Sequence, residues 1–162
     1  AVAEATTDAS GNYTFPAQAP ASNTFYEVSG AGRQSAVLFE GVKDLLTAQV
    51  SASSVQAGGA LTFSGAVAPG HAGHVIYLER QNRIGGDYHV VQVGLVGAGS
   101  TYTIEHFVYD PGVKVFRVRI PGGPENEGAA SAPFTVTALR APAKALKPEA
   151  TGNSSLPAEG EK

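Results

Sequence analysis

The chain has 162 residues, of which 43% are hydrophobic and 15% charged, with 20 glycines, 10 prolines and a formal net charge of -3. This length allows one ordinary domain and part of another, and the composition is typical of a folded, loop-rich β-protein. The negative charge argues against nucleic acid as the main partner, and the absence of cysteine excludes disulfides, thiolate metal ligands and a cysteine nucleophile.

The first forty residues predict three short strands joined by turns. Residues 8–12 (DASGN) predict a turn, which leads into a strand at 13–15. A connection rich in proline and alanine follows, and then strands at 24–28 and 34–42. The oxygen side chains of residues 8–12 also resemble the opening of a calcium loop, but no further acidic ligands or closing glutamate follow. We therefore expect a turn rather than a calcium site.

From residue 45 onward, short apolar runs alternate with turn sequences, and no helical periodicity is sustained. Pro111 and Gly112, for example, suit the two central positions of a tight turn. The pattern predicts an all-β, immunoglobulin-like (Ig-like) β-sandwich of about seven strands, although the Cys and Trp markers of antibody domains are missing. The expected strands are 45–53, 60–67, 74–81, 88–96, 100–108, 113–120 and 131–138.

Alternating residues within these strands predict which side chains share a face of each sheet. Residues that fall on one side of their strand are Leu61, Phe63 and Val67; Ile76 and Leu78; Val91, Val93 and Leu95; and Phe116, Val118 and Ile120.

The opening residues repeat the end of this domain. GNYTF (11–15) matches STYTI (100–104), NTFYEVSG (23–30) parallels VKVFRVRI (113–120), and QSAVLFEGV (34–42) parallels ASAPFTVTA (130–138). Such repetition indicates a tandem array. The predicted organisation is a partial, three-stranded repeat at 1–44, a complete sandwich at 45–138, and an extended Pro/Ala/Lys-rich tail or linker at 139–162.

Four of these segments carry a family resemblance: Asp8–Phe15, Asn23–Val28, Ala57–Pro69 and Gly73–Gln81. They resemble the tandem bacterial Ig-like (immunoglobulin/fibronectin-III-like) repeats of large secreted and surface proteins, particularly actinobacterial ones. The resemblance covers residues 8–138, and its motifs are structural. It implies a module that serves as a spacer, stalk, adhesive unit or appendage, secreted or at the cell surface.

Three strands alone bury too little apolar area to offset chain entropy, and they leave open edges. Three explanations remain open. The chain is a piece of a longer protein, another subunit donates the missing strands and so builds a fibre, or the three strands pack on the following domain. The tail is a poor donor because it lacks β-branched runs.

Candidate chemical sites are sparse. The four histidines, His71, His74, His89 and His106, show no metal motif, and strand order does not obviously bring them together; we expect no metal and no cofactor. No nucleophile elbow or phosphate loop occurs, so we expect no enzyme. Glu79 and Glu105 are the residue types of a glycosidase pair. Glu79 is nevertheless expected to pair across strands with Arg117 or Arg119.

The outward face of strands 74–81 and 113–120 is the best candidate for binding, through Tyr77, Glu79, Arg117 and Arg119. Tyrosine and arginine are favoured at contact hot spots, so this face suits a surface glycan or a matrix protein. The alternatives are packing against a neighbouring repeat and a plain solvent face.

The expected function is a non-catalytic structural or adhesive module of a secreted or cell-surface protein. Neighbouring Ig-like repeats or identical subunits are its expected partners, and the unfinished first repeat raises the prospect of a fibre completed by strand exchange. A carbohydrate- or protein-binding module is the alternative. No apolar run approaches the roughly 18 residues of a membrane helix, so no membrane span is expected.

Overall fold

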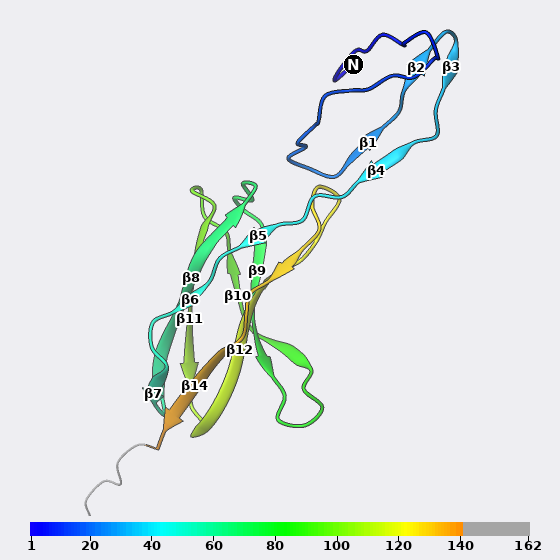
Figure 1. Ribbon diagram of the computed structural model, residues 1–162. Coiled ribbons are helices and arrows are strands. Elements are labelled where there is room, and N and C mark those ends of the chain that lie inside the picture. The colour runs from blue at the N-terminus through cyan, green and yellow to red at the C-terminus, as the bar shows by residue number, and fades with distance from the viewer. Residues whose placement is uncertain (141–162) are drawn as a thin grey trace, which may run out of the picture.

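The computed structural model describes residues 1–140, and every regular element in them is a β-strand. Figure 1 shows two parts: a β-sandwich that begins near residue 44, and an N-terminal lobe that extends from one end of it. Strand β14 ends at the opposite end of the sandwich. The predicted all-β class is therefore confirmed, while most of the predicted tail lies outside the described residues.

Two sheets form the sandwich. One has the order β10-β9-β12-β14-β7, with β13 paired to β12, and the other has the order β11-β8-β5, with β6 paired to β8. Only β14 and β7 run parallel; the other strand pairs are antiparallel. The bounds are β5 (Leu45–Leu46), β6 (Gln49–Val50), β7 (Ser54–Gln56), β8 (Gly59–Ala68), β9 (Val75–Gln81), β10 (Tyr88–Leu95), β11 (Thr101–Val108), β12 (Gly112–Ile120), β13 (Ala129–Ala130) and β14 (Phe134–Leu139).

The core lies between these sheets, and most of the predicted alternation is confirmed. Phe63 of one sheet packs against Phe116 of the other, with ring centroids 5.4 Å apart. This burial supplies the main stabilisation of the fold, at about 25 cal/mol for each Å² of apolar surface removed from water. The buried apolar residues are Leu61, Phe63, Val67, Ile76, Leu78, Val96, Tyr102, Ile104, Val108, Phe116, Val118, Ile120, Val136 and Ala138.

Strand β10 departs from the predicted pattern. Val91 packs against the core, but a register shift between Val90 and Gln92 reverses the alternation beyond it. Val93 and Leu95 are consequently 54% and 64% exposed. Placing Val91, Val93 and Leu95 on one side was wrong, because the bulge turns the last two outward.

The lobe contains two small antiparallel sheets, β1 (Thr24–Tyr26) with β4 (Leu38–Glu40), and β2 (Ser29–Gly30) with β3 (Arg33–Gln34). The strand predicted at 13–15 does not form. Its counterpart in the sandwich, β11, pairs only with β8, and the lobe has no strand equivalent to β8. A strand without a hydrogen-bonding neighbour is not stable in water, which explains the error.

The turn predicted at residues 8–12 is confirmed. The Asp8 carboxylate accepts hydrogen bonds from the backbone N–H groups of Ser10 and Asn12, at 2.8 and 2.9 Å. Hydrogen bonds from the backbone and side chain of Asn12 hold the pKa of Asp8 below its ordinary value. The carboxylate therefore caps its own turn, as an Asx turn does.

The lobe and the end of the sandwich share one pairing scheme. In the lobe the paired residues are Thr24–Glu40, Phe25–Phe39, Tyr26–Leu38, Ser29–Gln34 and Gly30–Arg33. At the aligned positions of the sandwich they are Lys114–Val136, Val115–Thr135, Phe116–Phe134, Arg119–Ala130 and Ile120–Ala129. The register of the hairpin is therefore the same in both places.

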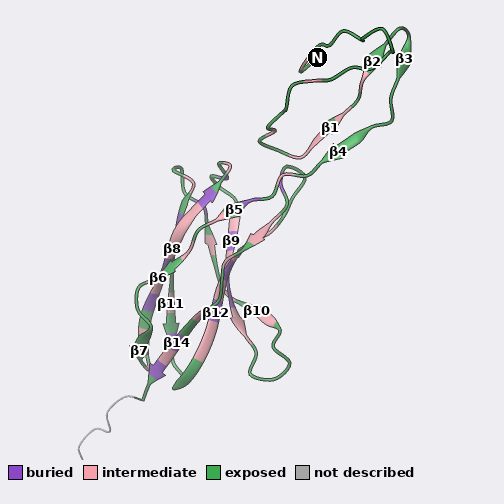
Figure 2. Cartoon of the chain, in the orientation of Figure 1, coloured by how far each residue is buried: buried purple, intermediate pink, exposed green. Residues whose placement is uncertain are grey.

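The two parts of the molecule differ in how far their residues are buried. Figure 2 shows the sandwich strands with buried segments and the lobe without any, and among the described residues none before Asp44 is buried. Residues 1–140 also contain no helix long and apolar enough to span a membrane.

Candidate functional site

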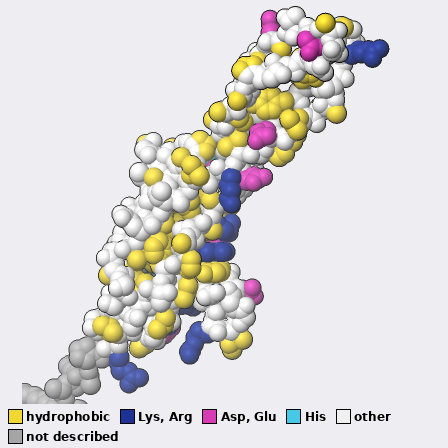
Figure 3. All heavy atoms as spheres, in the orientation of Figure 1, with side chains coloured by type: hydrophobic (Ala, Val, Ile, Leu, Met, Phe, Trp, Pro, Cys, Tyr) yellow, Lys and Arg dark blue, Asp and Glu magenta, His cyan; other side chains and the backbone are white. Residues whose placement is uncertain are grey.

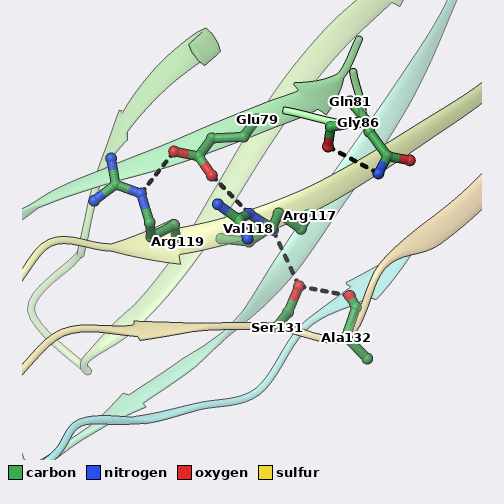
Figure 4. A network of polar contacts seen from close by, with 8 residues as sticks. All are labelled: Glu79, Gln81, Gly86, Arg117, Val118, Arg119, Ser131 and Ala132. Atoms are coloured by element: carbon green, nitrogen blue, oxygen red, sulfur yellow. Dashed lines mark hydrogen bonds and ion pairs between the residues drawn. The ribbon is translucent and has the colours of Figure 1, made fainter. Parts of the chain in front are cut away.

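The four residues predicted as a binding face do come together on the outer surface of β9 and β12. Arg117 lies directly opposite Glu79, and Arg119 lies opposite Tyr77. Arg117 Nε donates to Glu79 Oε2 at 2.7 Å, and Arg119 Nε donates to Glu79 Oε1 at 2.6 Å (Figure 4). The predicted ion pair is confirmed, and it involves both arginines rather than one.

Glu79 is almost fully buried beneath the two partly exposed guanidinium groups. Burial alone would raise the pKa of Glu79, but the hydrogen bonds and charges of Arg119 and Arg117 together outweigh it and hold the pKa below its ordinary value. The carboxylate therefore stays ionised at neutral pH, and its two oxygens are committed to the fold.

Tyrosine rings lie under both arginines. The guanidinium carbon of Arg117 is 3.9 Å from the ring centroid of Tyr88, and that of Arg119 is 5.0 Å from the ring centroid of Tyr77. These are cation–π distances. Sequence reasoning missed Tyr88, although its place at the start of the strand that pairs with β9 is a signal that it lies on the same sheet.

An apolar strip continues this face onto β10. Val93 lies opposite Tyr77, Leu95 lies opposite Val75, and Val90 lies opposite Glu79. Directly opposed residues point to the same side of a sheet, so three exposed apolar side chains lie beside the arginine–tyrosine pairs, two of them, Val93 and Leu95, turned outward by the bulge in β10. We call this set the outer face of β9, β10 and β12.

A polar junction joins the lobe to the sandwich. Asn23 donates from its backbone N–H to the carbonyl of Glu125 at 2.6 Å and accepts at Oδ1 from the N–H of Val42 at 2.8 Å. Buried Asn126 donates through Nδ2 to the carbonyls of Ala21 and Val42, both at 3.3 Å. Loop 121–128, which follows β12, thus contacts the lobe through several hydrogen bonds.

Two histidines meet at this junction. The rings of His71 and His74 are 4.7 Å apart, and one ring nitrogen of each lies within 4.8 Å of a Glu125 carboxylate oxygen. His89 and His106 lie on β10 and β11, away from this group. The sequence did not indicate this meeting, because loops 69–74 and 121–128 are brought together only by the order of strands in the sheets.

The junction also holds a buried contact between a histidine and a carboxylate. His71 Nε2 lies 2.6 Å from Asp44 Oδ1, and both side chains are almost fully buried. The backbone N–H of Asp44 donates to the carbonyl of Glu127, so the carboxylate is positioned by the same loop that contacts the lobe. Neither Asp44 nor this pairing was anticipated from the sequence.

No protein-family model and no curated protein sequence matches this chain. Function must therefore be inferred from the features described above: the repeated hairpin, its uneven burial, the outer face and the polar junction.

Proposed function

We propose that this chain is a non-catalytic structural or adhesive module of a secreted or cell-surface protein built from Ig-like repeats. In this proposal residues 45–138 are one complete Ig-like sandwich, and residues 1–44 are the last strands of another copy. The shared register of the two hairpins carries the proposal, because ten residues of the lobe pair as their sequence counterparts do in the sandwich.

A serine side chain makes the same hydrogen bonds in both hairpins, and this supports the same proposal. Ser35 Oγ accepts from the N–H of Val28 and donates to the carbonyl of Ala36, at 3.0 and 2.8 Å. Ser131 Oγ makes the same two bonds with Val118 and Ala132, at the same distances. A serine bridge at the same aligned position in both hairpins supports the proposal that they are copies of one repeat.

The uncovered side chains of the lobe indicate what this copy lacks. Tyr13 is 48% exposed, while its counterpart Tyr102 is 3% exposed in the core. Leu38 is 62% exposed, while its counterpart Phe134 packs against the core of the sandwich. Figure 3 shows hydrophobic side chains gathered on the visible face of the lobe. We propose that strands from a neighbouring repeat or an identical subunit cover Tyr13 and Leu38, the residues whose counterparts lie in the core of the sandwich.

The positions of the two ends suit a serial array. The lobe leaves one end of the sandwich and β14 reaches the other (Figure 1), so successive repeats would follow one another along a line. Such an arrangement fits a stalk or a fibre better than a compact assembly.

Hydrogen exchange and hydrodynamics test the proposal together. If strands from another copy complete the lobe, the chain should self-associate with rising concentration, and backbone amides of β1 and β4 should then become protected. If the covering strands belong to a preceding repeat, the chain should stay monomeric and these amides should exchange rapidly while those of β12 remain protected. A monomer in which β1 and β4 exchange as slowly as β12 would refute a partial repeat.

The outer face of β9, β10 and β12 favours a second candidate, a carbohydrate- or protein-binding module. Three exposed apolar residues beside two tyrosines and two arginines have the composition of a contact surface. A protein partner fits better than a glycan, because the arginines already cover the tyrosine rings on which a sugar would stack. This candidate predicts saturable binding to a matrix protein that Val93→Ser weakens with the fold intact; no binding across a glycan and matrix panel would refute it.

A further inference from the structure

One ring nitrogen of buried His71 has no hydrogen-bond partner within residues 1–140. The residue is 4% exposed, and its Nε2 is committed to Asp44 at 2.6 Å. Its Nδ1 is buried and makes no hydrogen bond among the described residues. A buried polar atom without a partner costs free energy, so its presence asks for an explanation.

The contact with Asp44 determines which ring nitrogen of His71 can bind a further partner. A carboxylate accepts, so Nε2 carries the proton and donates it, which leaves the Nδ1 lone pair of the neutral ring available. A histidine that ligates a metal commonly has this arrangement, in which the second nitrogen donates to a carboxylate that orients the ring. Asp44 is itself positioned by its backbone bond to Glu127.

Two more donors lie within reach. His74 and Glu125 each present an atom within 4.8 Å of a ring nitrogen of His71 and of each other, and both residues are exposed. In a tetrahedral zinc site with bonds of about 2.0–2.1 Å, neighbouring ligand atoms are about 3.3 Å apart. The three donors lie within 4.8 Å of one another, and rotation of the two exposed side chains would bring them to this spacing while buried His71 stays fixed.

We propose that His71 Nδ1, His74 and Glu125 form a binding site for a divalent transition metal ion, with Asp44 as the residue that positions His71. Two imidazoles and one carboxylate suit zinc best among the common ions, because calcium and magnesium prefer oxygen ligands alone. Water would complete the coordination on the exposed side.

The site would stabilise the junction between the two parts of the chain. Glu125 accepts a backbone hydrogen bond from Asn23 of the lobe at 2.6 Å, while His71 and His74 belong to the sandwich. A bound ion would therefore tie loop 69–74 to loop 121–128 and limit motion of the lobe. This inference does not depend on whether the lobe is a partial repeat.

Calorimetric titration of the full chain with zinc chloride tests the site, using protein without a histidine tag. We expect saturable binding of one ion per chain. His74→Ala and Glu125→Gln should each weaken binding about tenfold or more, and neither should unfold the protein because both side chains are exposed. His89→Gln is the matched control and should bind like the original chain. No saturable binding, or binding that both variants leave unchanged, would overturn the proposal.

Two further measurements separate a metal site from a merely structural hydrogen bond between His71 and Asp44. Cobalt titration should give the visible absorption of a tetrahedral nitrogen–oxygen site, and Asp44→Asn should lower zinc affinity about tenfold or more. Zinc should also slow exchange of the Asn23 amide, which faces Glu125. Equal zinc affinity in Asp44→Asn and the original chain, with no cobalt spectrum, would leave Asp44 and His71 as a structural pair only and refute the site.

Discussion

Two hairpins in this chain share a pairing scheme but differ in their surroundings. In the sandwich, β12 lies between β9 and β14 and packs across the core against β8. In the lobe, β1 and β4 pair only with each other, and their apolar side chains face solvent. Local sequence is therefore enough to specify register, whereas burial and stability depend on strands supplied from elsewhere.

Alanine substitutions at aligned positions test most directly whether the lobe and the sandwich differ in stability. Phe116→Ala should cost about 3–5 kcal/mol of unfolding free energy, because Phe116 is fully buried between the sheets. Its counterpart Tyr26→Ala should change the main unfolding transition by less than about 0.5 kcal/mol. Urea denaturation followed by circular dichroism measures both. A Tyr26→Ala cost comparable to that of Phe116→Ala would mean that the lobe belongs to the same cooperative core.

Glu79 distinguishes the sandwich further, since the lobe has no equivalent of β9. Glu79→Gln should cost about 1.5–3 kcal/mol, the range of hydrogen bonds to charged groups, because two partly exposed guanidinium groups lose the carboxylate that pairs with them. Exposed Glu105→Gln is the control and should stay within about 0.5 kcal/mol.

Glu79 should also make the free energy of unfolding depend on pH in the acid range. The pKa of Glu79 lies below its ordinary 4.5 in the folded protein, so the folded state binds this proton less readily than the unfolded state. Its stabilisation is therefore complete above pH 4.5 and is lost as the pH falls through the folded pKa. The free energy of unfolding, measured against pH, should show this loss in the original chain but not in Glu79→Gln. Parallel profiles for the two proteins would contradict the assignment.

The serine bridges of Ser131 and Ser35 place the same hydrogen bond in a half-buried and in an exposed environment. Ser131→Ala should cost about 1 kcal/mol, since it removes the acceptor of the Val118 N–H in a half-buried strand. Ser35→Ala removes the same bond in the exposed lobe, where water replaces it, and should cost less than about 0.3 kcal/mol. Equal costs for the two variants would show that the lobe is shielded from water.

The bulge in β10 predicts the smallest effect. Val93→Ala should change stability by less than about 0.5 kcal/mol, because the register shift turns Val93 to solvent. A loss of about 1 kcal/mol or more in thermal or urea unfolding would instead place Val93 in the core, as simple alternation predicts.

The sequence predicted most of the sandwich because its signals are local. Alternation located the buried faces of β8, β9 and β12, and the turn at residues 8–12 follows from its own sequence, in which Asp8 accepts the backbone hydrogen bonds. The errors arose where local signals depend on neighbours. The strand at 13–15 needed a partner that the lobe lacks, and the extra residue in β10 leaves no mark in an apolar run.

The candidate sites divide in the same way. The Glu79 pairs could be predicted because facing positions on adjacent strands follow from the strand order. The group of His71, His74 and Glu125 could not, because its members come from two loops far apart in sequence. Only the packed sheets bring those loops to the same end of the sandwich.

The parallel pairing of β7 with β14 has a mechanical consequence. The chain enters β7 from the side of the lobe and leaves β14 at the opposite end, and the pairs Thr137–Ser54, Ala138–Val55 and Leu139–Gln56 lie between. Tension applied along the chain pulls these two strands past each other, so their hydrogen bonds carry the force together in shear instead of opening one after another. A stretched molecule should accordingly lose its lobe at low force and resist much longer at this strand pair.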